Sequence, residues 1–296
     1  MLLTSIILWA ILLLAAAFLY YACRVEPRRL ATEQVRVHSG GLPAELEGFK
    51  LAHLSDLHLR NSRQVIAIGR QAVAEIMAQQ PDMILLTGDL GHRSWYADLA
   101  AEVLEPLAAE YGVYAVLGNH DLDHSPEMSV FWDTPTPVAI PEWVAAMNAI
   151  GLDALVNEHR CVEVRNRLVV IAGIGDPSCG YDDLAKALAE APDGDFKILL
   201  AHSPDIFDEP GVEWADMILC GHTHGGQVQL PYLGAPWAPV WRHRHRAAGL
   251  MRVGEHTLGY VSRGAGAGVV ARFNCPPEVT ILTLSEGYAD HLRLVK

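Results

Sequence analysis

The sequence predicts one α/β domain with mixed sheets, preceded by an N-terminal transmembrane helix. The chain has 296 residues, 51% of them hydrophobic, which is enough for one large core. Residues 1–23 carry no charged side chain, and from residue 49 onward strand-like apolar runs alternate with segments of helical spacing. We therefore divide the chain into a membrane anchor (1–23), a polar connector (24–48) and a single domain (49–296).

The predicted anchor contains an apolar run, residues 6–22, that is long enough to cross a bilayer as a helix. No basic residue precedes this run, which disfavours a secretory signal peptide. The bulky Tyr20 and Tyr21 disfavour a lipoprotein cleavage site before Cys23. An uncleaved single-pass anchor is the favoured interpretation. Under the positive-inside rule, the arginines that follow place the domain in the cytoplasm: Arg24, Arg28, Arg29 and Arg36.

The domain itself shows the alternation of strands and helices that is typical of α/β proteins. Residues 49–59 read as a strand that ends in polar residues, and residues 64–80 have the spacing of an amphipathic helix. From about residue 227 the chain looks mostly β. The further expected elements are a strand at 82–90, a helix at 96–111, a strand at 113–121, a helix near 141–150, two strands within 154–174, a helix near 181–191, strands at 196–205 and 216–226, a strand at 278–284 and a last segment near 291–295.

Five of the predicted strands run into short polar clusters at their carboxyl ends. Because the functional crevice of an open α/β sheet lies outside the carboxyl ends of its strands, we expect these turns to meet. Any one Asp or His among them could be a strand-end cap or a buried, hydrogen-bonded residue, but five clusters together favour a shared site. The residues concerned are Asp56 and His58, then Asp89, then Asn119, His120 and Asp121, then His202, and finally His222 and His224.

Composition limits the chemistry of that site. The formal net charge of −13 argues against nucleic-acid binding through bulk charge. The five cysteines are scattered without a C-x-x-C pair, which indicates neither a disulfide framework nor a cysteine zinc site. Carboxylate, amide oxygen and imidazole together suit divalent Mn, Fe, Zn or similar ions, and adjacent glycines leave room for the backbone. Bound cations would also let an acidic protein hold an anionic substrate.

The order D-x-H, G-D, G-N-H-D, a lone His and G-H-x-H resembles the calcineurin-like metallophosphoesterases over about residues 49–285. Near the C-terminus, YVSRGAG (260–266) and RFNCPPEVTILTL (272–284) resemble the membrane-anchored bacterial branch of that superfamily, which includes phosphodiesterases and a UDP-2,3-diacylglucosamine pyrophosphatase of lipid A synthesis. The resemblance implies that the domain folds as a four-layer αββα sandwich. It also implies that the protein is located at the bacterial inner membrane.

The resemblance also implies a site with two divalent metal ions roughly 3.5 Å apart. His120 would be a catalytic histidine that is not a ligand, and Asp121 would orient it. Many relatives read G-D-x-x-D where this chain has His92, which puts the support around His92 and Arg93 in doubt. The implied ligands of the first metal are Asp56, His58, Asp89 and His224, and those of the second are Asp89, Asn119, His202 and His222.

Such a pair of ions predicts a hydrolase of phosphoester or pyrophosphate bonds. The ions would lower the pKa of a bridging water, so that hydroxide attacks phosphorus in line with the leaving oxygen. The ions would also neutralise charge on the phosphoryl oxygens, and His120 would stabilise that charge or protonate the leaving group.

Two segments outside the metal motifs are candidates for choosing the substrate. Residues 125–143 contain Phe131, Trp132 and Trp143 among four prolines, and residues 231–246 place Trp237 and Trp241 before an R-H-R-H-R run. Both segments could be ordinary loops, or a lid or rim that faces the membrane. The R-H-R-H-R run could also be a solvated edge strand. By resemblance and by the fit of guanidinium to phosphate, Arg263 and Arg272 are candidate substrate contacts.

A lipid-linked nucleotide such as UDP-2,3-diacylglucosamine is the favoured substrate, because of the anchor and the aromatic and basic loops. A general phosphodiesterase or phosphatase for soluble esters is the alternative. A non-catalytic membrane-tethered scaffold is a third possibility, and it is disfavoured because every expected ligand and His120 are present.

Overall fold

Two six-stranded mixed sheets form the domain in a computed structural model, which describes residues 2–91, 97–121, 140–177, 180–240, 247–266 and 271–287. The first sheet has the order β1-β12-β2-β3-β4-β5, in which β12 runs antiparallel to β2 and the other neighbours are parallel. Its strands are β1 (Ala31–Ser39), β2 (Lys50–Leu54), β3 (Met83–Thr87), β4 (Val113–Val116), β5 (Asp153–Ala154) and β12 (Glu278–Glu286).

The second sheet has the order β10-β11-β9-β8-β7-β6, with antiparallel pairs at both edges and parallel pairs between them. Its strands are β6 (Glu158–Val164), β7 (Arg167–Gly173), β8 (Phe196–Leu200), β9 (Met217–Cys220), β10 (Gly249–Arg252) and β11 (Leu258–Val261). The antiparallel edge pair β6–β7 turns through Arg165 and Asn166, whose φ angles of 51° and 64° suit a two-residue hairpin.

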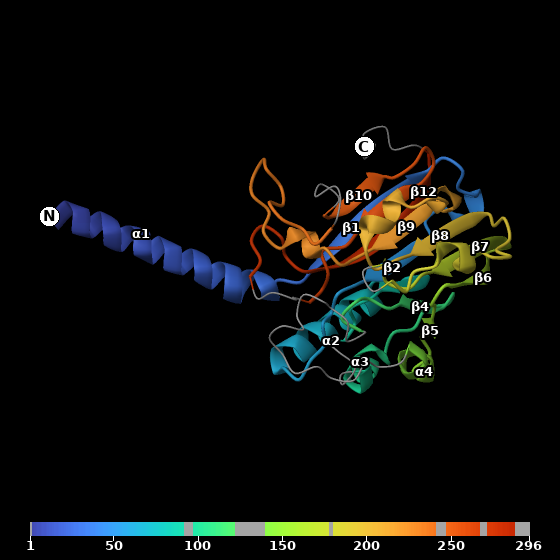
Figure 1. The fold of residues 1–296 in the computed structure, drawn as a ribbon, viewed down its shortest axis with the longest axis horizontal. Coiled ribbons are helices and arrows are strands. Elements are labelled where there is room, and N and C mark those ends of the chain that lie inside the picture. The colour runs from blue at the N-terminus through green and yellow to red at the C-terminus, as the bar shows by residue number, and fades with distance from the viewer. Residues whose placement is uncertain are drawn as a thin grey trace.

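The sheets pack face to face, and helices cover their outer faces. Figure 1 shows α2 (Arg63–Ala78), α3 (Ala97–Leu104) and α4 (Ile140–Ala149) together on the outer side of the first sheet. The outer face of the second sheet is covered by α5 (Leu184–Ala187) and by the 3₁₀ turns η6 (Pro204–Asp208) and η7 (Val212–Trp214). The expected four-layer αββα order is therefore present, with one thin outer layer.

Alternation along the central strands divides the interior into three cores, because successive strand side chains point to opposite faces. In β3, Leu85 faces the second sheet while Ile84 and Leu86 face the helices. In β7, Ile171 faces the first sheet and Ala172 lies in the outer core. Both central strands are buried on both faces, which explains their continuous apolar runs.

Three expected elements differ in the structure. The polar connector contains β1, which pairs in parallel with β12 along its whole length, from Ala31 to Ser39. The helix expected at 96–111 ends at Leu104, because Pro106 disfavours helical backbone at the residue before it. The helix expected near 181–191 is the single turn α5, whose N-terminus is capped by the Asp183 side chain. The last expected segment, 291–295, lies outside the described residues.

The N-terminal helix α1 (Leu2–Tyr20) leaves the domain as a separate rod (Figure 1). None of its residues is buried, and it is long and apolar enough to cross a membrane. A π-helical turn (Tyr21–Val25) and a 3₁₀ turn (Glu26–Arg28) join it to β1. A fully exposed helix of this composition is unstable in water unless it is covered, and a bilayer would cover it.

Candidate metal centre

The carboxyl ends of five strands bring the predicted ligands together. Strands β2, β3 and β4 lie side by side in the first sheet, and β8 and β9 are neighbours in the second. Backbone hydrogen bonds join adjacent turns. Asp56 donates its N–H to the Gly88 carbonyl at 3.0 Å, and Gly221 donates to the His202 carbonyl at 2.9 Å. The five turns that the sequence predicts to meet therefore lie together at the carboxyl ends of their strands.

The first group of potential metal ligands consists of Asp56, His58 and His224, all of them buried. The two imidazole Nε2 atoms lie 3.0 Å apart. Asp56 Oδ1 lies 3.6 Å from Nε2 of His224 and 3.9 Å from Nε2 of His58. Three donor atoms this close converge on one point, as the ligands of a single cation do.

The second group consists of Asp89, His202 and His222. Nε2 of His202 lies 3.2 Å from Asp89 Oδ2 and 3.1 Å from Nδ1 of His222. The same Asp89 oxygen lies 3.6 Å from Nε2 of His58, which belongs to the first group. Asp89 thus stands between the two groups, where a bridging carboxylate would be needed.

Asn119 supplies a further donor that fits a cation. Its Oδ1 atom is buried and has no hydrogen-bond partner among the described residues. A buried amide oxygen without a partner is costly, and a bound cation would satisfy it. Oxygen and imidazole donors without thiolate suit Mn, Fe, Zn or similar divalent ions, so the residues present fit the predicted metals.

The electrostatics of the two groups also fit bound cations. Burial raises the pKa of the Asp56 carboxyl to about 6 and lowers the pKa of His222 to about 4. Burial alone would lower the pKa of His202, but the carboxylates of Asp89, Asp56 and Asp176 together outweigh burial and raise this pKa well above its usual value. Without metal ions the site is therefore a set of competing buried charges, which divalent cations would balance.

The backbone of these turns is strained at the predicted ligands. Positive φ is uncommon for residues other than glycine, although Asp and His adopt it more readily than most. Such positions cost of order 1–3 kcal/mol each and cluster at functional sites. Five of the seven predicted ligands have positive φ: Asp56 (54°), His58 (48°), Asp89 (52°), His222 (67°) and His224 (50°).

Glycine is required beside the ligands because the turns approach one another closely. A Cβ atom on Gly221 would lie 1.8 Å from Ser55 Oγ and 2.3 Å from Asp56 Oδ2. A Cβ atom on Gly118 would lie 2.3 Å from Asp89 Oδ1. Glycine at these two positions therefore leaves the space that the carboxylates of Asp56 and Asp89 occupy.

His120 lies at the edge of the cluster, half-buried. Its ring centroid is 4.9 Å from that of His58, and its backbone N–H donates to Asp89 Oδ1 at 2.7 Å. One of its ring nitrogens also lies within 4.8 Å of potential ligand atoms of His58 and Asp89. This half-buried position, beside both groups, suits a proton donor to a bound substrate.

Asp121 has a role beyond the one expected from the sequence. Its Oδ1 accepts the Gly91 N–H and its Oδ2 accepts the Gly118 N–H, each at 2.9 Å. Both carboxylate oxygens are thus engaged by backbone groups of the turns after β3 and β4. Asp121 holds these two turns together, and with them the positions of Asp89 and Asn119.

The calcineurin-like phosphoesterase family model matches residues 49–226, more than half of the chain and the whole stretch that carries the five turns. The chain is a calcineurin-like phosphoesterase. Membership, together with the paired ligand groups, makes it a metal-dependent phosphoester hydrolase.

Named relatives span most of the phosphoesterase. Phosphodiesterase YaeI of Escherichia coli (strain K12) is 36% identical over 245 residues, covering 80% of this chain and 82% of the relative. Uncharacterized metallophosphoesterase YkuE of Bacillus subtilis (strain 168) is 29% identical, covering 89% of this chain and 88% of the relative. UDP-2,3-diacylglucosamine pyrophosphatase LpxG of Chlamydia trachomatis is 26% identical, covering 88% and 91%.

The two arginines expected to contact substrate are engaged inside the phosphoesterase. Arg272 is fully buried, and its guanidinium donates to the carbonyls of Cys275, Arg263, Gly264 and Gly266. Arg263 pairs with Glu278 at 2.6 Å and with Glu33 on β1. The expected substrate contact of Arg272 stays a prediction, and its guanidinium is buried among these carbonyls.

Arg272 contacts His224, one of the predicted metal ligands. Its Nη2 atom lies 3.4 Å from His224 Nδ1. Burial lowers the pKa of His224 well below its usual value, and the charge of Arg272 lowers it further. The imidazole is thereby held neutral, which is the form that binds metal ions.

The sequence interpretation missed three residues that support the ligands. Thr87 accepts from His202 Nδ1 at 2.6 Å, which leaves Nε2 available to a cation, and Ser55 Oγ donates to Asp56 Oδ2 at 2.6 Å. Asp176, fully buried, places Oδ2 3.9 Å from Nε2 of His202. Asp176 follows β7 in a sixth strand-end turn, so the signal that revealed the other five was present there as well.

Of the aromatic residues expected in the substrate loops, Trp143 is a core residue of α4 and is 3% exposed. Trp237, by contrast, is 58% exposed. His92, Phe131, Trp132, Trp241 and the basic run 242–246 lie outside the described residues.

Proposed function

We propose that this phosphoesterase uses two divalent metal ions to hydrolyse a phosphoester or pyrophosphate bond of a lipid-linked nucleotide, such as UDP-2,3-diacylglucosamine, at the bacterial inner membrane. The observation that carries the two-ion proposal is the position of Asp89 Oδ2 between the two ligand groups, 3.6 Å from His58 Nε2 and 3.2 Å from His202 Nε2. Among the named relatives, one is a phosphodiesterase and one is a UDP-2,3-diacylglucosamine pyrophosphatase.

The proposed residue roles follow from position. Asp56, His58, Asp89 and His224 would hold one ion, and Asp89, Asn119, His202 and His222 would hold the other. When bound, such ions activate water as a nucleophile near neutral pH and neutralise charge on the phosphoryl oxygens. His120 would donate a proton to the leaving oxygen, a role that suits its half-buried position beside the ligands.

The exposed helix α1 supports a membrane substrate. Its side chains are solvent-exposed along the whole length and, apart from Thr4 and Ser5, mainly apolar, with Leu2 78% exposed at one end and Tyr20 65% exposed at the other. Arg24, Arg28 and Arg29 follow directly, which favours the cytoplasmic face for the domain. A hydrolase tethered in this way would meet substrates that are held in the same membrane.

A second exposed apolar segment lies near the end of α1. Leu230, Tyr232, Leu233 and Trp237 belong to residues 228–237, which we name the apolar loop, and each is at least 37% exposed. The base of the loop is joined to Phe273, whose carbonyl accepts from the Gln229 N–H at 2.9 Å. The Phe273 ring packs at a tilt of 59° against Phe18 of α1, with centroids 4.9 Å apart. Figure 1 shows this segment, in orange, on the side of the domain from which α1 leaves. Such a loop suits contact with a lipid–water interface.

The test is a comparison of substrates with the full chain, loaded with Mn²⁺. Hydrolysis of UDP-2,3-diacylglucosamine should exceed hydrolysis of a soluble diester such as bis(p-nitrophenyl) phosphate in kcat/KM. No preference for the lipid substrate would remove this proposal and leave the broader phosphoesterase activity.

A general phosphodiesterase for soluble esters is the second candidate. It is favoured by the higher identity to the phosphodiesterase relative, 36% against 26% for the pyrophosphatase relative. In that case the soluble diester would be cleaved at least as efficiently as the lipid nucleotide, and removal of residues 1–23 would leave kcat/KM for the diester unchanged.

A further inference from the structure

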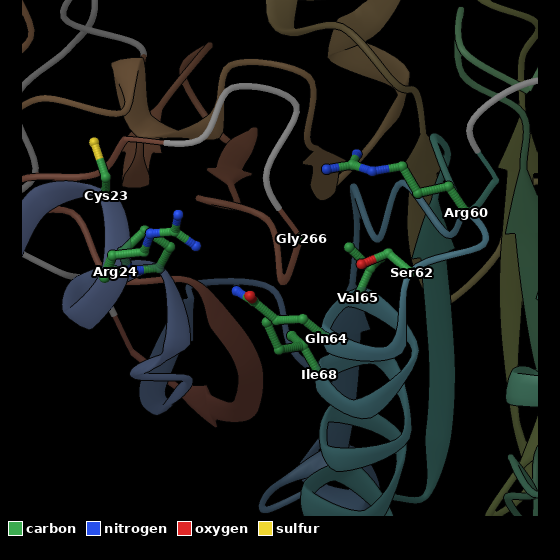
Figure 2. Close-up of a pocket in the computed structure, with 9 residues that line it drawn as sticks. Cys23, Arg24, Arg60, Ser62, Gln64, Val65, Ile68 and Gly266 are labelled. Atoms are coloured by element: carbon green, nitrogen blue, oxygen red, sulfur yellow. The ribbon is translucent and has the colours of Figure 1, made fainter.

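A cavity of about 210 Å³ lies where the N-terminal segment meets the domain, and Arg60, two residues after His58, lines it. Figure 2 shows Cys23 and Arg24 on the N-terminal side, and Gln64, Val65 and Ile68 on helix α2 opposite them. This volume is smaller than the roughly 300–1,000 Å³ of pockets that enclose whole organic ligands. The cavity therefore suits a head group rather than a complete nucleotide-lipid.

The charge of the cavity comes from two arginines on opposite walls. Arg24 follows the anchor, and Arg60 follows the His58 turn and extends toward the same space in Figure 2. Within the described part of the chain, neither guanidinium has a hydrogen-bond or carboxylate partner. Two arginines that line one hollow without protein partners in the described chain offer their N–H donors and positive charge to a bound anion.

The walls combine polar and apolar groups in the way that a lipid head group requires. Ser62, the N-cap of the 16-residue helix α2, lines the cavity and makes no side-chain capping bond, so the unpaired N–H groups of the first turn lie close by. Val65 and Ile68 supply an apolar wall. Arg28 donates to Gln64 Oε1 at 2.9 Å and joins the N-terminal segment to this helix.

We propose that this cavity binds the phosphate of an anionic glycerophospholipid from the bilayer that holds α1. The cavity begins at Cys23, three residues after α1 ends at Tyr20, which is the level at which lipid phosphates lie beside a membrane span. Arg24 and Arg60 would hold the phosphate through charge-assisted hydrogen bonds. This inference rests on the proposed membrane anchoring of α1 but not on the proposed substrate.

The bound lipid would also set the position of the metal centre relative to the membrane. Gly266 lines the cavity and donates its N–H to the Asp56 carbonyl at 2.8 Å. Arg60 lies two residues after His58 on the same turn. A phosphate held between Arg24 and Arg60 therefore ties the end of the span to the turn that carries two predicted ligands.

Cys23 makes occupancy measurable in the full chain, because this free thiol lines the cavity. We would reconstitute the protein in phosphatidylcholine vesicles with and without phosphatidylglycerol, and follow maleimide labelling by peptide mass spectrometry. Phosphatidylglycerol should slow the labelling of Cys23 about fivefold, in proportion to the unoccupied fraction. Labelling of Cys161, an exposed thiol on β6, should not change.

Variants separate the cavity from general surface charge. Arg60→Gln or Arg24→Gln should raise the phosphatidylglycerol fraction needed for half-protection about tenfold, the loss of one charged hydrogen bond. Arg29→Gln removes the same charge near the end of the span, from a residue that does not line this cavity, and should preserve protection. Equal loss in Arg29→Gln, or full protection in both cavity variants, would overturn the site.

Two further experiments test the identity of the ligand and the membrane anchoring of α1. Protection by millimolar inorganic phosphate in pure phosphatidylcholine vesicles, equal to that given by phosphatidylglycerol, would overturn the lipid assignment. Failure of the protein to float with any vesicle would overturn the anchoring and the lipid site together, whereas the substrate comparison in solution would still report on the proposed hydrolysis.

Discussion

His222 donates its backbone N–H to both carboxylate oxygens of Asp56, at 3.1 and 3.0 Å, while its side chain lies in the other ligand group, with Nδ1 3.1 Å from His202 Nε2. One residue thus orients a ligand of the first group with its backbone and contributes a ligand to the second with its ring. The G-H-x-H turn sets the spacing of the two groups.

This division predicts that the two histidines of the turn serve different metals. Replacing either His222 or His224 with Ala should remove about one of two bound metal equivalents, because each ring belongs to a different group. The backbone N–H that holds Asp56 survives in His222→Ala. Elemental analysis of the purified variants measures this. If the assignment holds, the variant with both substitutions should lose both metal equivalents. A double variant that loses only one equivalent would contradict the assignment, because both histidines would then serve the same metal.

Replacing His120 with Ala should lower turnover by about two to four decades, the usual contribution of a general acid or base, with metal content nearly intact. The backbone N–H that His120 donates to Asp89 remains in the variant. Initial rates and elemental analysis on the same sample measure both quantities. His256→Ala is the matched control, since its side chain is 75% exposed. Loss of both metals in His120→Ala would show that His120 supports metal binding, and would reject its proposed role as a proton donor that is not a ligand.

Replacing Asp121 with Asn should lower the free energy of unfolding by about 1–3 kcal/mol, because one of two buried backbone N–H groups loses its acceptor. Metal affinity should fall with it, since Gly91 and Gly118 flank the turns of Asp89 and Asn119. Urea unfolding measures the change, with Asp193→Asn, at a side chain 94% exposed, as the control. If Asp121 served only to orient His120, kcat would fall while stability and metal content stayed constant.

Replacing Gly221 with Ala should destabilise the protein by about 1–3 kcal/mol or more, because the new Cβ would overlap Ser55 Oγ and Asp56 Oδ2. Thermal unfolding and metal content should both fall. Gly41→Ala offers the matched control, since nothing lies within 4 Å of a Cβ there. Unchanged stability and metal content in Gly221→Ala would show that the turn yields easily and that the close approach is not required.

Metal removal should lower the melting temperature, because ions that bind only the folded state stabilise it by about 2.7 kcal/mol at a hundred times their Kd. Differential scanning calorimetry with and without EDTA measures this, and Mn²⁺ should restore the transition. Asp89→Asn should show a smaller shift than wild type, since Asp89 lies between both groups. An EDTA-insensitive melting temperature that Mn²⁺ also leaves unchanged would argue against metal binding at this cluster.

Much of the candidate site was predictable because its chemistry is local in the chain. Asp56 with His58, and His222 with His224, lie within single turns after apolar strands, so residue type and spacing were enough to place them. Asp176 escaped although it follows β7 in the same G-D pattern that revealed Asp89 after β3. The role of Arg272 escaped because the carbonyls that surround its guanidinium come mostly from residues 263–266, folded onto it.

The connector, residues 24–48, shows that local sequence patterns also miss part of the fold. Residues 31–39 look polar and linker-like, yet they form β1 by pairing with β12, which lies almost 250 residues further along the chain. Arg263, in turn, pairs with Glu33 on this strand. A strand whose stabilising partner is so distant leaves little periodic signal of its own, because the pairing rather than local propensity stabilises it.

Periodicity and turn chemistry are local properties, so the class of fold, most of its strands and helices, and the residue types suited to metal ions could be predicted from the residues alone. The position of Asp89 between two ligand groups, the burial of Arg272 behind His224, and the placement of Arg24 and Arg60 on one cavity could not. Those relationships depend on how two sheets and the end of a helix meet, and side chains distant in sequence become neighbours only when burial of the three cores brings them together.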